Sequence, residues 1–578
     1  MALSSIVMLH AAIATLAVFT HSANAKGFLS EKRGSLRSSA DASAFQAELR
    51  NAMGEAMGCG GHVGQERLAE IERDLRVMWQ AMPKNAKDRV ERRSLRYLVH
   101  RYFYQQSALM VRGFEPSRPT NASSWGSDDI LSQRVPAYVE SVLESQHVHE
   151  NGFSLEDAVL MVATLEQLIF DSESAVLEKV YKHQNKPSHR SLTEVGLEQV
   201  LEDYMVHWLL GEDEESIRIA LRQKSILKDN IPHWDKVVAF TKGQIQALAF
   251  QRQHAPAKTS RPGHNALAPR YSFEDAHEVV GGITRSFASF WDSECASMKA
   301  SLVQMDSHNT GRVPLSKFYN TALNTEWRFG ESESYLRELG ALDETSSWYG
   351  KQVIIPNYLQ AASNCIVSSQ HYLVCCINEC ESLLGEIEAS VGKDAATPAQ
   401  ILSLVQNMTS QTTLDHDEPP HLGSSLRSQL EQIAAGAGGT VPLHGRLFAQ
   451  WLHYVFPREC PFPHKKGTAA SLTPQQYGDS FIASKDEMQQ HASSVDETDA
   501  LATMNKDDLQ WMSQWSPEEE LVADYAGSFR APWEKGHFAV GGILLFLVCG
   551  VVGTMGFGRR MMTSDMDLLP THSKAHFV

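Results

Sequence analysis

The chain has 578 residues, of which 43 % are hydrophobic and 21 % are charged, and its formal net charge is −17. This composition is that of a globular protein, and the length allows several domains. So acidic a chain is excluded as a general nucleic-acid binder, because phosphate binding requires a concentrated basic surface.

Residues 1–25 predict a cleaved signal peptide. An apolar run from Ile6 to Phe19 is followed by polar residues and by small side chains at Ala23 and Ala25. Small residues in this arrangement fit a signal peptidase site after Ala25. The alternative, an uncleaved anchor helix, is disfavoured because the apolar run is short for a membrane span.

A first helical domain is expected over residues 45–252, after a polar leader at 26–44. Apolar residues recur in this domain with the spacing of one face of a helix. Helices are expected at 84–110, 130–147, 154–171, 174–183, 191–210, 213–227 and 232–252.

The helix predicted at 84–110 has one apolar face and one basic face. We interpret the basic face as solvated, with contact to anionic lipid or glycan as the alternative. The apolar face carries Leu95, Leu98, Val99 and Tyr102, and the basic face carries Arg89, Arg92, Arg93, Arg96 and His100.

A second helical domain is expected at 271–463, after a proline-containing linker at 253–270. Its one strand-like run starts at Gln352 and is ended by Pro356. Residues 464–537 are acidic and lose apolar periodicity, which favours a stalk. The expected fold class is all-α: two helical domains of helix–loop–helix units and one C-terminal transmembrane helix.

Residues 286–325 contain the most informative motif. An apolar helix pattern leads to a loop that begins at Asp306, has Gly311 at its sixth position and Val313 at its eighth, and precedes a second helix pattern. This arrangement resembles an EF-hand, whose loop turns sharply at a glycine in position 6. The resemblance implies candidate calcium ligands at Asp306, His308, Thr310 and Arg312.

The loop departs from the EF-hand pattern where calcium chemistry is decided. Lys317 replaces the bidentate glutamate of position 12, and Asp306 is the loop's one carboxylate. A calcium loop needs several hard oxygen ligands, so tight calcium binding is not expected. Calcium is still the one cofactor that the sequence suggests.

A weak repeat of this motif is expected around 425–456. The run from Gly311 to Leu315 has an echo in the run from Gly439 to Leu443, which also lies between two helix patterns. We hypothesise that the two segments pair, with Val313 facing Val441. The alternative is a coincidental similarity of five residues.

The cysteines predict a disulfide framework. In a secreted or lumenal domain a disulfide is the default state of a cysteine pair. Seven cysteines lie in the predicted lumenal part, and because this number is odd, at least one thiol stays free or pairs between chains. A zinc site at the cluster 375–380 is the alternative, although no CxxC pair accompanies it. The disulfide candidates are Cys59, Cys295, Cys365, Cys375, Cys376, Cys380 and Cys460, and Cys549 lies in the predicted membrane helix.

Residues 538–558 carry no charged side chain and predict a transmembrane helix. At roughly 1.5 Å per residue, a helix of this length spans the hydrocarbon core of about 30 Å. Arg559 and Arg560 follow directly, so the positive-inside rule places the tail 559–578 in the cytosol. The sequence therefore predicts a single-pass type I membrane protein with the lipid bilayer as a partner.

Short motifs lie on both sides of the predicted membrane helix. Asn121 and Asn407 begin glycosylation sequons in the lumenal part. Asp565, Leu568 and Leu569 in the tail resemble an acidic dileucine sorting signal, which implies a trafficking adaptor as a partner.

No catalytic motif is found: there is no HExxH sequence, and Ser480 lies outside any GxSxG turn. We expect a non-enzymatic binding or scaffold ectodomain in the endomembrane system or plasma membrane, with an unknown lumenal protein or glycan as partner. The alternatives are a calcium-binding lumenal protein, a sorting receptor, and a lumenal enzyme whose site is assembled from distant residues.

Overall fold

The computed structural model describes a set of segments that lie within the first of two units of the chain, Met1–Ala523. The described residues are 65–115, 152–211, 214–231, 233–254, 269–324, 328–345, 350–369, 371–408, 420, 422–493 and 514–520.

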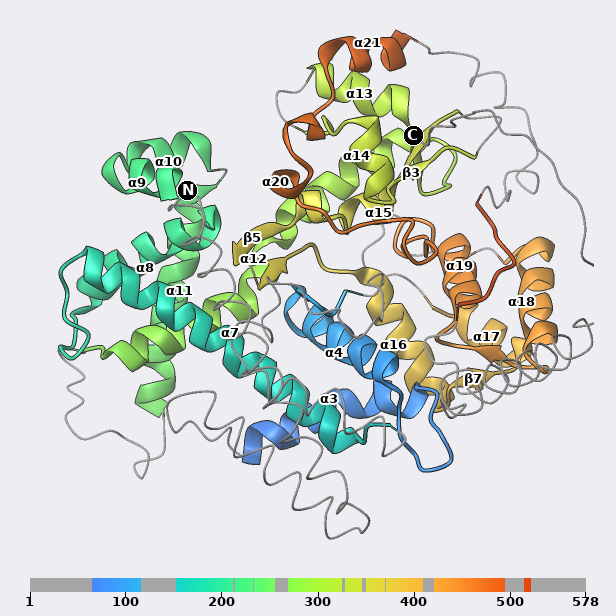
Figure 1. The fold of residues 1–578 in the computed structure, drawn as a ribbon, viewed down its shortest axis with the longest axis horizontal. Coiled ribbons are helices and arrows are strands. Elements are labelled where there is room, and N and C mark those ends of the chain that lie inside the picture. Colours follow the sequence, from blue (N-terminus) through green and yellow to red (C-terminus); the bar gives the residue numbers. More distant parts are fainter. Residues whose placement is uncertain are drawn as a thin grey trace, which may run out of the picture. The chain divides into compact units, whose positions relative to one another are not determined.

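The described part is mostly helical, as the sequence predicts (Figure 1). The α-helices are α3 (Gln65–Ala81), α4 (Arg92–Ser107), α7 (Leu155–His183), α8 (Glu194–Leu210), α9 (Glu214–Arg222), α10 (Ser225–Asn230), α11 (Trp234–His254), α12 (Phe273–Met305), α13 (Leu315–Asn324), α14 (Glu333–Glu338), α15 (Ile355–Leu359), α16 (Glu379–Val391), α17 (Pro398–Val405), α18 (Ser424–Gly436), α19 (Arg446–Val455), α20 (Pro474–Tyr477) and α21 (Lys485–Ser493), with 3-10 turns η2 (Ala362–Asn364) and η3 (Asp479–Phe481).

Short strands accompany the helices, so all-α describes the fold only in outline. They form two three-stranded sheets, in the orders β1-β6-β5 and β2-β4-β3, and the pair β7-β8. The strand-like run predicted at Gln352 is β4. The strands are β1 (Leu109–Val111), β2 (Arg312–Pro314), β3 (Leu342–Asp343), β4 (Gln352–Ile354), β5 (Ile366–Ser369), β6 (Tyr372–Val374), β7 (Ala395–Ala396) and β8 (Val441–Pro442).

The observed helices differ from the expected ones mainly at their ends. The expected helices 154–171 and 174–183 are one continuous helix, α7. The expected helix 213–227 is split into α9 and α10. The helix expected at 130–147 lies outside the described residues.

A repeated local arrangement organises the described helices: a short antiparallel contact joins two chain segments, each directly ahead of a helix. Val90 and Phe153 exchange both backbone hydrogen bonds, at 2.9 and 2.8 Å, and Leu192 and Tyr271 do the same at 2.7 and 2.9 Å. Two further contacts lie within the small sheets, where Val313 pairs with Val353 and Ala396 pairs with Val441.

Helix caps explain why a helix follows each contact so closely. Ser154 and Ser272 form capping boxes with Asp157 and Asp275, in which each side chain bonds the other residue's backbone N–H. Thr193 caps α8 in the same position relative to its contact. A polar cap that satisfies the free N–H groups of a first turn starts a helix at a defined residue.

The predicted pairing of Val313 with Val441 is wrong. Val313 pairs with Val353, and Val441 pairs with Ala396, in separate sheets. The echo between the two segments therefore reflects a shared local structure and not a shared contact. Each segment pairs with a nearer neighbour along the chain, for which closing the intervening loop costs less entropy.

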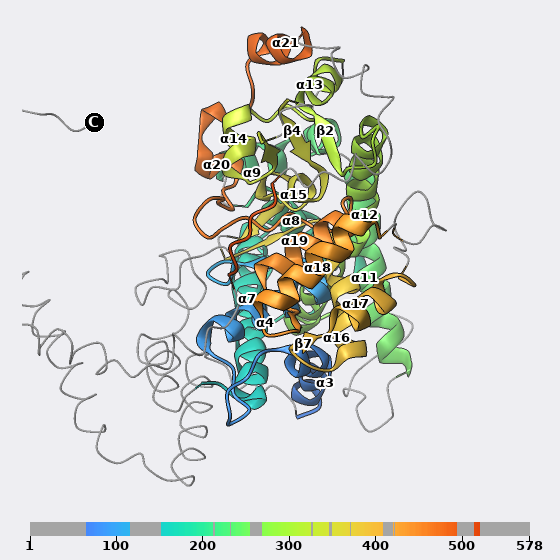
Figure 2. The same ribbon diagram turned by 90° about the vertical axis from the view of Figure 1, so that its right-hand side faces the viewer.

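The apolar side chains of the described part gather in separate core clusters. One cluster joins α3, α4, α7, α8, α11 and the first half of α12, a second surrounds α13 to α15, and a third joins α16 to α19. Helix α12 contributes Phe287 to the first cluster and Leu302 to the second. Helices α16, α17, α18 and α19 lie side by side in both views (Figure 2).

A buried ion pair connects α4 of the first cluster with α16 of the third. The guanidinium of Arg101 donates to both carboxylate oxygens of Glu388, and its Nε donates to Glu381 at 2.6 Å. The side chains of Arg101 and Glu388 are both fully buried. On the same helix Arg96 and His100 are also buried, so the predicted basic face of this helix is not a solvated face.

Three disulfides confirm the predicted framework: Cys295–Cys376, Cys365–Cys375 and Cys380–Cys460. Two of them bridge distant parts of the chain, since Cys376 reaches α12 and Cys380 reaches the segment after α19. The alternative zinc site at this cluster is wrong, because a disulfide sulfur is not a thiolate ligand. Such a framework indicates an oxidising compartment or an extracellular location.

Residues 464–493, expected to be part of the stalk, pack against the folded body. Helix α21 lies along α13 (Figure 1), and Ala483 and Met488 are buried in the second cluster. Ser332 N–H donates to the carbonyl of Phe481 at 2.8 Å. Sequence periodicity missed this segment because few of its side chains are apolar.

No helix among the described residues is long and apolar enough to cross a membrane. The predicted signal peptide, the membrane helix 538–558 and the tail with Asp565, Leu568 and Leu569 lie outside those residues, as do Cys59 and Asn121.

Replacing Glu388 by Gln tests the buried ion pair. The variant leaves the Arg101 guanidinium buried without its counter-charge, so we expect the free energy of unfolding to fall by about 3–5 kcal/mol in urea denaturation. The control is Glu386→Gln on the exposed face of the same helix, which should change it by less than about 0.5 kcal/mol. Equal effects of the two substitutions would contradict a structural role for the pair.

Candidate functional site

The loop that resembles a calcium site is closed by the protein's own groups. Oδ1 of Asp306 accepts the backbone N–H of Thr310 at 3.0 Å, and Oδ2 accepts that of Gly311 at 2.9 Å. Nε of Arg458, which follows α19, donates to the same Oδ2 at 3.1 Å. A guanidinium cation therefore lies on this carboxylate, where an EF-hand carboxylate would face calcium.

Gly311 is required for this closure. Its φ is +71°, and a Cβ at this position would lie 1.9 Å from the carbonyl oxygen of Pro457. The loop and the segment after α19 thus approach more closely than any other residue type allows. The glycine of the motif serves the approach of Arg458 to Asp306.

Arg312, a predicted ligand, and Lys317, which replaces the glutamate of position 12, make other contacts. Arg312 is buried and its Nε donates to Asp343 at 2.9 Å. Lys317 donates to the hydroxyl of Ser307 at 3.2 Å. Across the described segments, no group of three or more His, Cys, Asp or Glu side chains is arranged to hold a metal ion.

We expect Asp306→Ala to destabilise the protein equally with and without calcium. The substitution removes the acceptor of two backbone N–H groups and leaves Arg458 without its carboxylate, which should cost about 2–4 kcal/mol. Thermal unfolding of the full chain in calcium and in EGTA measures this. A rise of Tm in calcium that disappears in Asp306→Ala would show instead that the loop binds the ion.

A buried carboxyl group lies at the junction of α7, α8, α12 and β6. Glu173 accepts hydrogen bonds from the hydroxyls of Thr284 and Tyr372, the latter at 2.7 Å, and Trp208 Nε1 donates to the Tyr372 hydroxyl at 3.2 Å. Burial raises the pKa of Glu173 to about 7, against the hydrogen bonds, which lower it. Such a group titrates near neutral pH inside the core.

Two buried histidines, His444 and His453, lie just before α19 and within it. Nε2 of His444 lies 3.2 Å from Glu388, and Nδ1 of His453 lies 2.6 Å from the carbonyl oxygen of Cys460. Burial lowers the pKa of each to about 3. Both rings are therefore neutral at physiological pH, and both are buried in the protein.

Glu173 gives the stability a defined pH dependence. Its pKa rises from 4.5 to about 7 on folding, so between these values the folded chain binds more protons than the unfolded chain. The contribution to stability is therefore present at the acid end of this window and is lost as the pH rises through it.

Glu173→Gln keeps an acceptor for Thr284 and Tyr372 but does not ionise. We expect the variant to gain on the order of 3 kcal/mol over wild type as the pH rises from about 5 to about 8, in urea denaturation at each pH. Buried histidines such as His100, whose pKa burial lowers to about 4, are common to both proteins and cancel in the difference. Parallel pH profiles of the two proteins would contradict the assignment.

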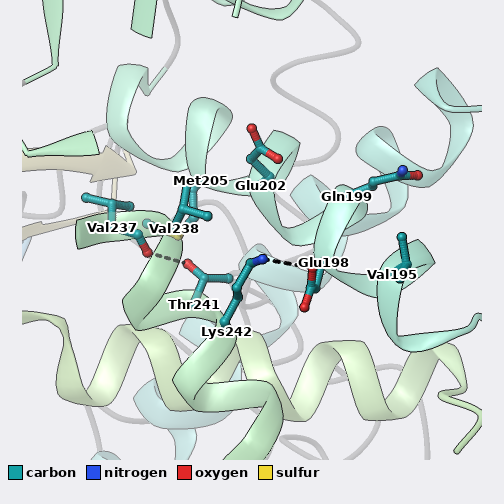
Figure 3. A pocket seen from close by; sticks show the side chains of 9 residues that line it. All are labelled: Val195, Glu198, Gln199, Glu202, Met205, Val237, Val238, Thr241 and Lys242. Atoms are coloured by element: carbon teal, nitrogen blue, oxygen red, sulfur yellow. Dashed lines mark hydrogen bonds and ion pairs between the residues drawn. The ribbon is translucent and has the colours of Figure 1, made fainter. Parts of the chain in front are cut away.

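A surface groove runs between α8 and α11 (Figure 3). Its volume is about 200 Å³, below the roughly 300–1,000 Å³ of small-molecule sites. Lys242 reaches across it to Glu198, with an Nζ–Oε2 distance of 3.1 Å, and Val195 at one end is 63 % exposed. The lining residues are Val195, Glu198, Gln199, Glu202, Met205, Val237, Val238, Thr241 and Lys242.

A second, more open hollow of about 460 Å³ lies near the end of α3. It is lined by Arg76, Trp79, Gln80, Lys87, Asp88, Arg89, Ser154 and Leu155. The groups with strongly shifted pKa values, such as Glu173 and His444, line neither hollow. Neither of these two hollows therefore combines a cavity with an acid or base of strongly shifted pKa.

Asn407 is exposed just after α17, and its side-chain amide donates to the carbonyl of Ser403 at 3.0 Å. An exposed position suits a glycosylation acceptor.

The buried charges of Arg101 and Glu388 were not predicted from the sequence. Arg101 lies three residues after Leu98 on the apolar side of α4, and Glu388 lies four residues after Leu384 on α16. A single charge of opposite sign on each of two apolar faces is the signal that would have found the pair. This signal identifies the two charges that become buried, but it does not show which residue each of them pairs with.

No protein-family model, curated protein or solved structure matches this chain.

Proposed function

We propose that this chain is a single-pass type I membrane protein whose helical lumenal or extracellular part is a non-enzymatic binding or scaffold module. The observation that carries the proposal is the disulfide framework, together with buried charges that form ion pairs with each other. Arg101 with Glu388, and Arg312 with Asp343, are buried pairs of this kind. Charges that are paired with one another in this way support the architecture and are not available for chemistry.

We infer that the helix pairs joined by antiparallel contacts are EF-hand-like units that act without calcium. Two features support this: the contact at Val313 lies at the eighth loop position, and the turn at Gly311 lies at the sixth. The Arg458 guanidinium on Asp306 supports the absence of the ion. These contacts favour a structural role of the helix pairs over the alternative function of calcium binding.

The proposed membrane anchor is residues 538–558, and the tail motif with Leu568 and Leu569 would connect the protein to a trafficking adaptor. What supports the placement is the agreement between the signal peptide pattern, the disulfides and the exposed sequon at Asn407. All three support a placement in which the large N-terminal part faces an oxidising, glycosylating compartment.

Membrane topology tests this proposal directly. In sealed vesicles from cells that make the full chain, external protease should remove only about the last twenty residues, since the bilayer protects the rest. Alkaline carbonate should leave the chain in the membrane pellet.

Glycosidase treatment supplies the matched control. The wild-type chain should shift in mobility on treatment, and Asn407→Gln should lose one step of that shift. Digestion of the disulfide-bonded part from outside the vesicles, or release of the chain by carbonate, would overturn the proposed anchor and orientation.

A further inference from the structure

The segment 514–520 (Gln-Trp-Ser-Pro-Glu-Glu-Glu) lies against the N-terminal half of α19 in the way that a peptide lies on a receptor. Gln450 of α19 is fully buried. Its Nε2 donates to the carbonyl of Ser516 at 3.0 Å, and its Oε1 accepts the N–H of Ser516 at 3.1 Å. One side-chain amide thus makes both hydrogen bonds that a neighbouring β-strand would make.

The acidic end of the segment occupies the start of α19. The backbone N–H of Leu447 donates to the carboxylate of Glu519 at 3.1 Å, and that of Arg446 donates to the carbonyl of Glu520 at 3.2 Å. Gly445 at the N-cap has no side chain that could cap this helix, so the first N–H groups of α19 need other acceptors. A Cβ on Gly445 would come within 2.9 Å of the Glu519 carboxylate, so glycine leaves room for the peptide.

Basic groups surround the same carboxylates. Nη1 of Arg446 donates to the carbonyl of Glu518 at 2.9 Å, and Lys465 forms an ion pair with the Glu518 side chain. The backbone N–H of Lys466 donates to Glu520 at 3.3 Å. A helix N-terminus and cationic side chains together favour negative charge at this point.

The other end of the segment is held by an aromatic contact. Trp515 packs against the third core cluster, with its ring centroid 6.3 Å from that of Tyr454. The hydroxyl of Tyr454 accepts the N–H of Gln514 at 3.2 Å. Pro517 has no N–H to satisfy and favours an extended conformation at Ser516, which is the conformation that the Gln450 grip requires.

We propose that the start of α19 is a recognition site for an extended acidic peptide, and that residues 514–520 are its resident ligand. The ligand has an aromatic side chain three residues before a run of carboxylates. Gln450 binds the backbone of that peptide, Lys465 and the helix N-terminus bind its carboxylates, and the surface beside Tyr454 binds its aromatic ring. The site goes beyond the scaffold function, because an acidic peptide of another chain can bind there when the resident segment has dissociated.

The resident segment competes with any peptide added in solution. Its attachment to the same chain gives it an effective concentration in the millimolar range, so the wild-type site is occupied. A test therefore needs a variant in which the resident segment is weakened and the site itself is intact. Trp515→Ala has this property, since Trp515 belongs to the ligand and not to the site.

The probe is a fluorescent synthetic peptide of residues 511–522, added to the full-length chain in detergent micelles and followed by anisotropy. We expect Trp515→Ala to bind it at least tenfold more tightly than wild type. A second substitution, Gln450→Ala, should weaken that binding at least tenfold, and the control Gln432→Ala on the exposed face of α18 should leave it unchanged. A peptide with glutamine in place of its glutamates should bind at least tenfold more weakly.

Glu518→Lys with Glu519→Lys is the second way to open the site, because it reverses the charge of the resident segment without removing an apolar side chain. The two opened proteins should bind the peptide alike. If neither binds it more tightly than wild type, or if Gln450→Ala has no more effect than Gln432→Ala, the segment is a fixed part of the fold and the proposal is overturned. This outcome is independent of membrane topology, so it leaves the proposed anchor untouched.

Discussion

The buried ion pair between Arg101 and Glu388 is the interaction on which the rest of the described structure depends. The Arg101 guanidinium lies fully buried between two helices that belong to different core clusters, and its partner Glu388 is equally buried. Two charges removed from water are costly unless each satisfies the other, so the pair permits one relative placement of α4 and α16. His444, Tyr97 and Glu381 surround the pair, which makes the junction a polar network inside an apolar body.

Polar groups that suggest a function when read from the sequence serve this architecture instead. Asp306 is a candidate calcium ligand in the sequence, but in the structure it accepts hydrogen bonds from its own loop and from Arg458. Segments expected to be a free stalk follow the same rule, since α21 covers α13 and residues 514–520 cover the start of α19. Residues of the same chain therefore occupy both the Asp306 loop and the start of α19.

The disulfides extend the same constraint covalently. Cys295–Cys376 ties α12 to the segment that follows β6, and Cys380–Cys460 ties the start of α16 to the segment that follows α19. The parts joined in this way carry the Asp306 loop and the Gln450 site. A clamp of this kind restricts the unfolded chain and keeps the small helical units from separating.

The sequence by itself determined the helical class, the positions of most helices, the disulfide-forming cysteines and the local turn at Gly311. These depend on short-range causes: the period of apolar residues, polar caps such as Ser154 and Ser272, and a backbone angle that only glycine adopts readily. Which segments pair was decided only by the tertiary structure. Val313 pairs with Val353 and not with Val441, Arg101 pairs with Glu388, and Arg458 pairs with Asp306. The two residues of each pair are far apart in the sequence, and the period of apolar residues carries no information on such distant contacts. A residue's neighbours along the chain fix its local conformation, but the partner that neutralises a buried charge is chosen by packing of the whole body.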